Sequence, residues 1–115
     1  DIAELRVSAH VLIRRTGEVI QYVPFNRRAW HAGRSTFAGR VDCNDYSIGI
    51  ELEGADDVPY TDAQYICIAQ LCGTLMSVWP AIVHKRIVGH CHIAPGRKSD
   101  PGEAFDWERF YALLV

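Results

Sequence analysis

The stretch YTDAQYICIAQLCGTLMSVW, residues 60–79, limits the possible folds most strongly, because it predicts a long amphipathic helix. Thr61 followed three residues later by Gln64 forms a capping box, in which each side chain satisfies an orphan backbone N–H group. Pro80 cannot continue the helix. Apolar residues recur at helical spacing and predict one buried face: Tyr65, Ile68, Ala69, Cys72, Leu75, Met76 and Trp79. A helix with one apolar face needs a second layer of structure to pack against.

Strand patterns precede this helix and supply such a layer. VSAHVLIRRTGEVIQYV, residues 7–23, predicts a β-hairpin, because two apolar, β-branched runs flank a turn in which Gly17 suits a positive φ angle. Residues 24–46 are rich in turn-forming residues and indicate a loop. YSIGIELEG, residues 46–54, predicts a mostly buried strand.

Two elements are expected after the long helix. RIVGH, residues 86–90, predicts a short strand, and FDWERFYALLV, residues 105–115, predicts a second helix with Asp106 as its N-cap. Four residues of that helix are expected to face the core: Trp107, Phe110, Tyr111 and Leu114. The order β-β-β-α-β-α indicates an α/β (α+β) fold, a mixed central β-sheet flanked by helices.

Composition narrows the class of protein. A chain of 115 residues with 49% apolar and 23% charged residues suits one globular domain. The net charge of −2 gives no global attraction to nucleic acid or to an anionic membrane, and no apolar run is long enough to span a bilayer. The four cysteines form no C-x-x-C pair, which argues against a cysteine-rich zinc site and favours reduced thiols in the cytoplasm.

The segment GHCHIAPGRKSDPG, residues 89–102, gathers reactive side chains in an irregular loop. His90 is expected at the end of a strand, and Gly96 and two prolines let the loop bring Asp100 back toward it. A histidine and a carboxylate are part of what a catalytic zinc site needs, namely three protein ligands and one open position. The alternative is a surface loop in which Asp100 caps the turn before Pro101.

Two other groups of polar residues have both a functional and a structural interpretation. Strand alternation places Glu51 and Glu53 on the same side of their strand. One of them could be a general base near a metal-bound water, or both could simply face solvent. Trp30 and His31 suit binding of a sugar or a carboxylate, although Trp30 is more typical of a residue that plugs the core beneath a loop. His10, alone in a strand, is expected to be a hydrogen-bonded structural residue.

Several segments together resemble a known family. VSAHVLIRRTGEVIQYVPFNRRAWHAG, CNDYSIGIELEG, YTDAQY and GHCHIAPGRKSDPGEAFDWERF are similar to the type-2 N-acetylmuramoyl-L-alanine amidases, and the similarity covers essentially the whole chain. Their relatives include phage amidase lysozymes and peptidoglycan recognition proteins. Within the family, the match is to the cytoplasmic bacterial zinc enzymes that cleave the bond between N-acetylmuramic acid, in its 1,6-anhydro form, and L-alanine during cell-wall recycling.

The resemblance implies specific roles for residues of this chain. His90 and Asp100 would be zinc ligands, Lys98 would stabilise the developing oxyanion, and Glu51 would accept the proton of the attacking water. The expected partner is an anhydro-muropeptide. The resemblance also implies three substrate-binding residues: Arg6, Trp30 and Arg97.

The chain departs from the family pattern at two places. The basic residue that family members tend to carry before the cysteine of CND is Asp42 here, which is expected to alter recognition of the acidic peptide stem. The family's first histidine ligand lies on a strand before VSAH, and that strand and a following helix are absent from this sequence. We therefore interpret residues 1–115 as one amidase catalytic domain that is N-terminally incomplete, with a third ligand upstream of residue 1. The missing strand would leave a sheet edge that its own N-terminal segment could cover.

Two other functions stay open. One is a non-catalytic module that binds peptidoglycan fragments, and the other is an amidase that acts on intact peptidoglycan. Joint presence of Glu51, His90, Lys98 and Asp100 favours an enzyme, because a module that only binds has no use for all four.

Overall fold

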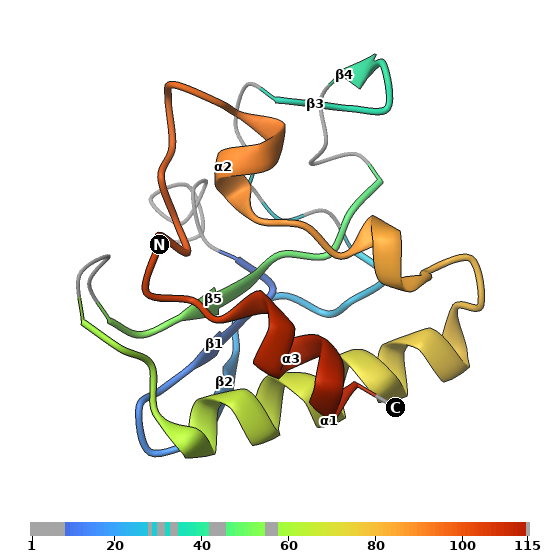
Figure 1. The fold of residues 1–115 in the computed structure, drawn as a ribbon. Helices are drawn as coiled ribbons and strands as arrows, with labels where there is room; N and C mark the ends of the chain where they lie inside the picture. The colour runs from blue at the N-terminus through green and yellow to red at the C-terminus, as the bar shows by residue number, and fades with distance from the viewer. Residues whose placement is uncertain are drawn as a thin grey trace.

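A mixed three-stranded sheet forms the centre of the molecule in a computed structural model that describes residues 9–27, 29, 32, 35–41, 46–54 and 58–114. The sheet contains β1 (Val11–Ile13), β2 (Val19–Gln21) and β5 (Ile50–Leu52) in the order β2-β1-β5. β2 pairs antiparallel and β5 pairs parallel to β1. Figure 1 shows the helices arranged around this sheet, which confirms the predicted α+β class.

The first hairpin forms as predicted. The backbone N–H of Arg14 donates to the carbonyl of Glu18 at 2.8 Å, and Gly17 closes the turn with a φ of +89°. A side chain at position 17 would also come within 3.2 Å of the Ala63 Cβ, so glycine serves both the turn and its contact with the next helix.

The segment 24–46 contains a small hairpin that the sequence did not predict. β3 (Thr36–Phe37) and β4 (Arg40–Val41) pair antiparallel around a two-residue turn. Ala38 and Gly39 both have positive φ, at 51° and 82°. Such a turn usually carries Asn-Gly or Asp-Gly, so alanine at its first position does not predict a hairpin.

The long helix α1 (Asp62–Val78) confirms the strongest prediction. Both halves of the Thr61–Gln64 capping box are present, and five of the seven residues predicted on its apolar face are buried. The fully buried Gln64 amide also donates to the carbonyls of Ile13 and Glu53, at 3.2 and 2.9 Å. One side chain therefore caps the helix and joins it to the ends of β1 and β5.

The predicted strand 86–90 is wrong. Residues 84–86 form a 3₁₀ turn, η3 (His84–Arg86), and His90 begins a short helix, α2 (His90–Ile93). The β-branched pair Ile87 and Val88 is too short to decide between strand and turn. Ile87 packs against the helical core instead, and its carbonyl accepts a hydrogen bond from the Tyr111 hydroxyl.

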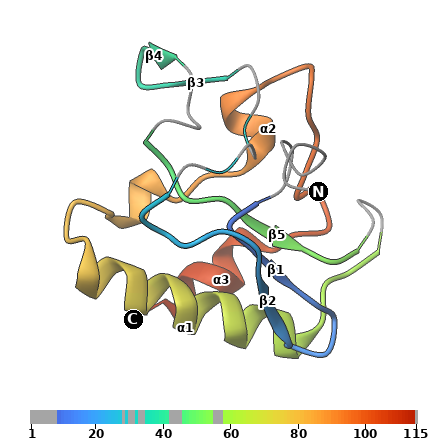
Figure 2. The same ribbon diagram turned by 180° about the vertical axis from the view of Figure 1, so that it is seen from behind.

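The last helix, α3 (Trp107–Leu113), begins at Asp106, whose side chain caps it by accepting from the backbone N–H of Arg109. α3 lies beside α1, and Figures 1 and 2 show both helices on the same side of the molecule, with α2 at the other end. Phe110 and Leu114 are buried as predicted, whereas Trp107 and Tyr111 are half-buried. Among the described residues, no helix has the length and apolar character to cross a bilayer.

Candidate active site

An open cleft of about 1600 Å³ lies between β5, α2 and the loop that follows α2. Five of the seven residues to which the family resemblance gives a role line it: Glu51, His90, Arg97, Lys98 and Asp100. Three different parts of the chain supply them, so the fold brings together groups that are far apart in sequence.

The cleft is rich in positive charge. Of the described residues that line it, six are basic and two are acidic: Arg27, Arg40, Lys85, Arg86, Arg97 and Lys98, against Glu51 and Asp100. The whole chain carries a net charge of −2, so basic groups are concentrated here. Such a cleft favours ligands that carry carboxylates.

His90, the first residue of α2, lies beside Asp100 from the loop that follows α2. The Nδ1 atom of His90 lies 3.3 Å from Oδ2 of Asp100. The backbone N–H of Cys91 donates to the carbonyl of Asp100 at 3.0 Å, so the main chain holds the two residues close together. The expectation that the loop returns Asp100 to His90 is confirmed, although His90 begins a helix instead of ending a strand.

The other imidazole nitrogen of His90 determines what Nδ1 can do. Nε2 lies 2.8 Å from the carbonyl oxygen of Ala32, which can only accept, so Nε2 carries the hydrogen. In the neutral ring Nδ1 then presents a lone pair to the carboxylate of Asp100. Two such acceptors repel each other unless a proton or a metal ion lies between them.

This pair fits a zinc ion. Zn–N and Zn–O bonds at tetrahedral angles place the two ligand atoms roughly 3.3–3.5 Å apart, and the observed separation is 3.3 Å. A histidine ligand usually donates its other N–H to a carbonyl or a carboxylate, as His90 does. Within the described ranges no group of three or more His, Cys, Asp or Glu side chains could hold a metal, so the pair stands there without a third such side chain.

Glu51 and Glu53 have different surroundings. Glu51 lies at the middle of β5, opposite Leu12 in the register, and its exposed side chain lines the cleft. Oε1 of Glu53 instead accepts a hydrogen bond from the backbone N–H of Arg15 at 2.9 Å and lies 3.8 Å from Nε of Arg14. Tertiary contacts therefore leave Glu51 as the carboxylate available for chemistry.

His10 and Cys72 lie near the sheet, and their contacts indicate structural roles. The buried His10 accepts at Nδ1 from the backbone N–H of Gly49 and donates from Nε2 to the carbonyl of Arg27, as expected for a structural residue. Cys72 lines the cleft, but burial raises the pKa of its thiol to about 12. Such a buried, protonated thiol behaves as a small apolar core residue, as the sequence predicted.

Three sequence predictions lie outside the described residues, namely those for Arg6, Trp30 and His31, as does the departure at Asp42. Two features of the cleft could not be predicted from the sequence. The Ala32 carbonyl gives no sequence signal, because every residue has one. The Arg40 guanidinium stacks 4.0 Å from the centre of the Tyr46 ring, a contact that depends on the unpredicted β3–β4 hairpin.

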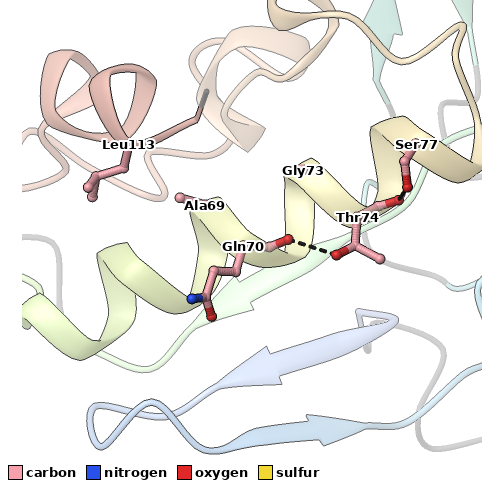
Figure 3. A pocket seen from close by; sticks show the side chains of 6 residues that line it. All are labelled: Ala69, Gln70, Gly73, Thr74, Ser77 and Leu113. Atoms are coloured by element: carbon pink, nitrogen blue, oxygen red, sulfur yellow. Dashed lines mark hydrogen bonds between the residues drawn. The ribbon is translucent and has the colours of Figure 1, made fainter.

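A second, shallow depression lies along α1 and the end of α3 (Figure 3). Its two hydroxyl groups bond to their own helix, since Thr74 donates to the carbonyl of Gln70 and Ser77 to that of Thr74. Neither hydroxyl is beside a base that could activate it, so the chemistry of the described residues centres on the larger cleft.

The fold and the cleft belong to a family of amidases. The chain belongs to the N-acetylmuramoyl-L-alanine amidase family, which matches residues 1–103. It is 62% identical over 115 residues to the 1,6-anhydro-N-acetylmuramyl-L-alanine amidase AmpD of Salmonella typhimurium strain SL1344, covering all of this chain and 61% of that protein. The chain thus spans about three-fifths of the length of the AmpD proteins that it matches.

Two solved structures extend the comparison. A selenomethionine derivative of AmpD superimposes with a TM-score of 0.93 at 60% identity, covering 99% of this chain and 63% of that one. AmiD from Escherichia coli, solved with anhydro-N-acetylmuramic acid-L-Ala-D-γ-Glu-L-Lys, gives a TM-score of 0.87 at 32% identity and covers 99% and 51% of the two chains.

Proposed function

We propose that this chain is the catalytic part of a zinc amidase that hydrolyses the bond between 1,6-anhydro-N-acetylmuramic acid and L-alanine in muropeptides. One observation carries the proposal: the His90–Asp100 pair shares a basic cleft with Glu51 and Lys98 in a chain of the amidase family. The likeness to AmpD, whose name specifies the anhydro form, supports the substrate.

His90, through Nδ1, and Asp100, through Oδ2, are the proposed zinc ligands within this chain. The family resemblance implies a histidine as the third ligand, and the described residues place no third such side chain beside this pair. When bound, zinc supplies Lewis acidity: it acidifies a water molecule to a pKa of about 7 and polarises the substrate carbonyl. The Ala32 carbonyl keeps the hydrogen of His90 on Nε2, which leaves Nδ1 free for the metal.

Glu51 is the proposed general base. It accepts a proton from the attacking water and then returns a proton to the departing amine of L-alanine. Its place in β5 supports this role, because a strand paired to a neighbour holds the carboxylate more rigidly than a loop would.

Lys98 is proposed to stabilise the oxyanion. Negative charge develops on the carbonyl oxygen as water attacks, and a cation already in position stabilises it without reorganisation. The backbone N–H of Lys98 donates to the Ala94 carbonyl at 3.0 Å, which ties the start of its side chain to α2.

Substrate binding is proposed to use the surrounding basic and aromatic groups. Arg6 and Trp30 are proposed to contact the peptide stem and the anhydro-sugar, and the excess of basic side chains in the cleft suits the carboxylates of the stem. Cell-wall recycling would take place in the cytoplasm. Reduced thiols agree with that location, since Cys67, Cys72 and Cys91 are free.

Hydrolysis of a defined substrate tests the proposal. The complete zinc-loaded protein would be incubated with a 1,6-anhydro-N-acetylmuramyl tripeptide or with intact peptidoglycan, and products would be identified by mass spectrometry. We expect free tripeptide and anhydro-sugar, and no release after chelation of the metal. Binding without cleavage would instead indicate a non-catalytic module, and preferential release from intact peptidoglycan would indicate an amidase of the cell wall itself.

A further inference from the structure

The carbonyl oxygen of Ala32 accepts two hydrogen bonds at the edge of the cleft. His90 donates from Nε2 at 2.8 Å, and the Arg97 guanidinium donates from Nη2 at 2.6 Å. A carbonyl oxygen has two lone pairs, so it can accept both donors at once. Ala32 is fully buried, which keeps water from competing with these contacts.

The position of this oxygen fixes the orientation of His90. The imidazole can donate to Ala32 only if Nε2 carries the hydrogen and the ring is turned so that Nδ1 faces Asp100. Partners of this kind orient metal-binding histidines and contribute to metal affinity. Whatever holds the Ala32 carbonyl in place therefore also holds Nδ1 toward the metal.

Arg97 is placed to hold that carbonyl. Its backbone N–H donates to the Ala94 carbonyl at 3.1 Å, and the backbone N–H of Ala94 donates to the carbonyl of His90 at 3.0 Å. The main chain of Arg97 is thus tied to α2, while its side chain extends to Ala32. Hydrogen bonds from a cation are stronger than neutral ones, so this donor makes a firm link between the two segments.

We infer that Arg97 is a positioning residue for His90, acting through the Ala32 carbonyl, in place of the substrate-binding role that the family resemblance implied. This inference rests on the proposed function, because it takes His90 to be a zinc ligand. It makes a distinct claim, however: loss of the Arg97 side chain weakens zinc binding before any substrate is present.

Zinc affinity of the complete protein tests the inference. The zinc Kd of wild type, Arg97→Met and Arg86→Met would be measured by competition with a chelating dye. Arg86 is a matched control, since it lines the same cleft and donates to a backbone carbonyl, that of Ala81. We expect Arg97→Met to raise the Kd roughly 10- to 100-fold, as loss of a ligand's hydrogen-bonding partner does. Arg86→Met should leave it within about twofold, because remote surface charge is screened.

Two further measurements separate positioning from unfolding and from substrate contact. Thermal unfolding of the metal-free variants checks that the fold persists, and Arg97→Lys, which keeps the charge and one donor, should recover part of the lost affinity. In zinc-saturated enzyme, Arg97→Met should lower kcat more than it raises KM.

An unchanged zinc Kd together with a raised KM in Arg97→Met would overturn the inference and restore Arg97 as a substrate contact. The proposed function fails in a different way, by absence of zinc from the wild-type protein or by full zinc occupancy after His90→Ala. The first pattern rejects only the role of Arg97, and the second rejects the metal site itself.

Discussion

Nδ1 of His90 and Oδ2 of Asp100 lie 3.3 Å apart, although ten positions separate the two residues in the chain. The hydrogen bond from the Cys91 backbone to the Asp100 carbonyl brings the loop back, and the Ala32 carbonyl turns the imidazole toward the carboxylate. Two acceptor atoms at this separation match the spacing of two ligands in a tetrahedral zinc site.

Removal of one member of this pair should release the metal. Asp100→Asn replaces a charged oxygen ligand by a neutral one, so we expect the purified complete protein to hold far less than stoichiometric zinc by elemental analysis. Glu103→Gln is a matched control, because it removes an exposed carboxylate from the same segment. Stoichiometric zinc in the Asp100 variant would show that this carboxylate is not a ligand.

Substitutions of Glu51 and Glu53 should have different effects, with loss of activity at position 51 and a small loss of stability at position 53. Glu51→Gln removes the proposed base and should lower kcat by roughly 10²- to 10⁴-fold, with the fold intact by circular dichroism. Glu53→Gln keeps an oxygen that can accept from Arg15 and loses a half-exposed ion pair with Arg14, so stability should fall by at most about 1 kcal/mol. Equal activity losses in the two variants would contradict the assignment of Glu51.

Lys98 and Lys85 both line the cleft and make a matched pair of cations. Lys98→Met should reduce kcat by roughly 10²- to 10³-fold, because a charge that stabilises the oxyanion is lost. Lys85→Met should change kcat little, while KM for an acidic muropeptide rises modestly. Steady-state kinetics would give kcat and KM for both variants. Near wild-type kcat in Lys98→Met would show that Lys98 does not stabilise the oxyanion.

Gln64 should matter more for stability than an ordinary capping residue. Thr61→Ala loses an N-cap and the hydroxyl that donates to the Arg15 carbonyl, and should cost about 1–2 kcal/mol. Gln64→Ala also deprives the Glu53 carbonyl of its amide donor, so an additional roughly 1–3 kcal/mol is expected. Urea denaturation would measure both values, with the exposed Gln70→Ala as a control. A smaller loss for Gln64→Ala than for Thr61→Ala would contradict a role in joining α1 to the sheet.

The thiol of Cys72 should resist alkylation in the folded protein. Burial raises its pKa from 9.0 to about 12, so the folded thiol stays protonated where the unfolded one ionises. At about pH 9 the folded state should hold roughly 500-fold less thiolate, the form that reacts with iodoacetamide. Mass spectrometry of the Cys72 peptide, with and without urea, provides the comparison. Rapid labelling of the native protein would show that this thiol is solvated.

Interactions between near neighbours in the chain were the most predictable. The capping box of Thr61 and Gln64, the Gly17 turn and the Asp106 cap each depend on a few consecutive residues, and each is present. The strand predicted at 86–90 is wrong because two β-branched residues cannot outweigh the packing of Ile87 against the core and the hydrogen bond from Tyr111 of α3 to its carbonyl. The hairpin around Ala38 was missed because alanine rarely takes a positive φ angle.

Local sequence patterns predict the first hairpin, α1, α3 and the α+β class, and the resemblance to the amidases implies the residues of the candidate site. Only the tertiary structure decided what separates Glu51 from Glu53 and what Arg97 contacts. Those answers depend on the Arg15 backbone and the Ala32 carbonyl. Main-chain groups are alike at almost every position, so a sequence carries no mark of which of them will meet a side chain from a distant segment.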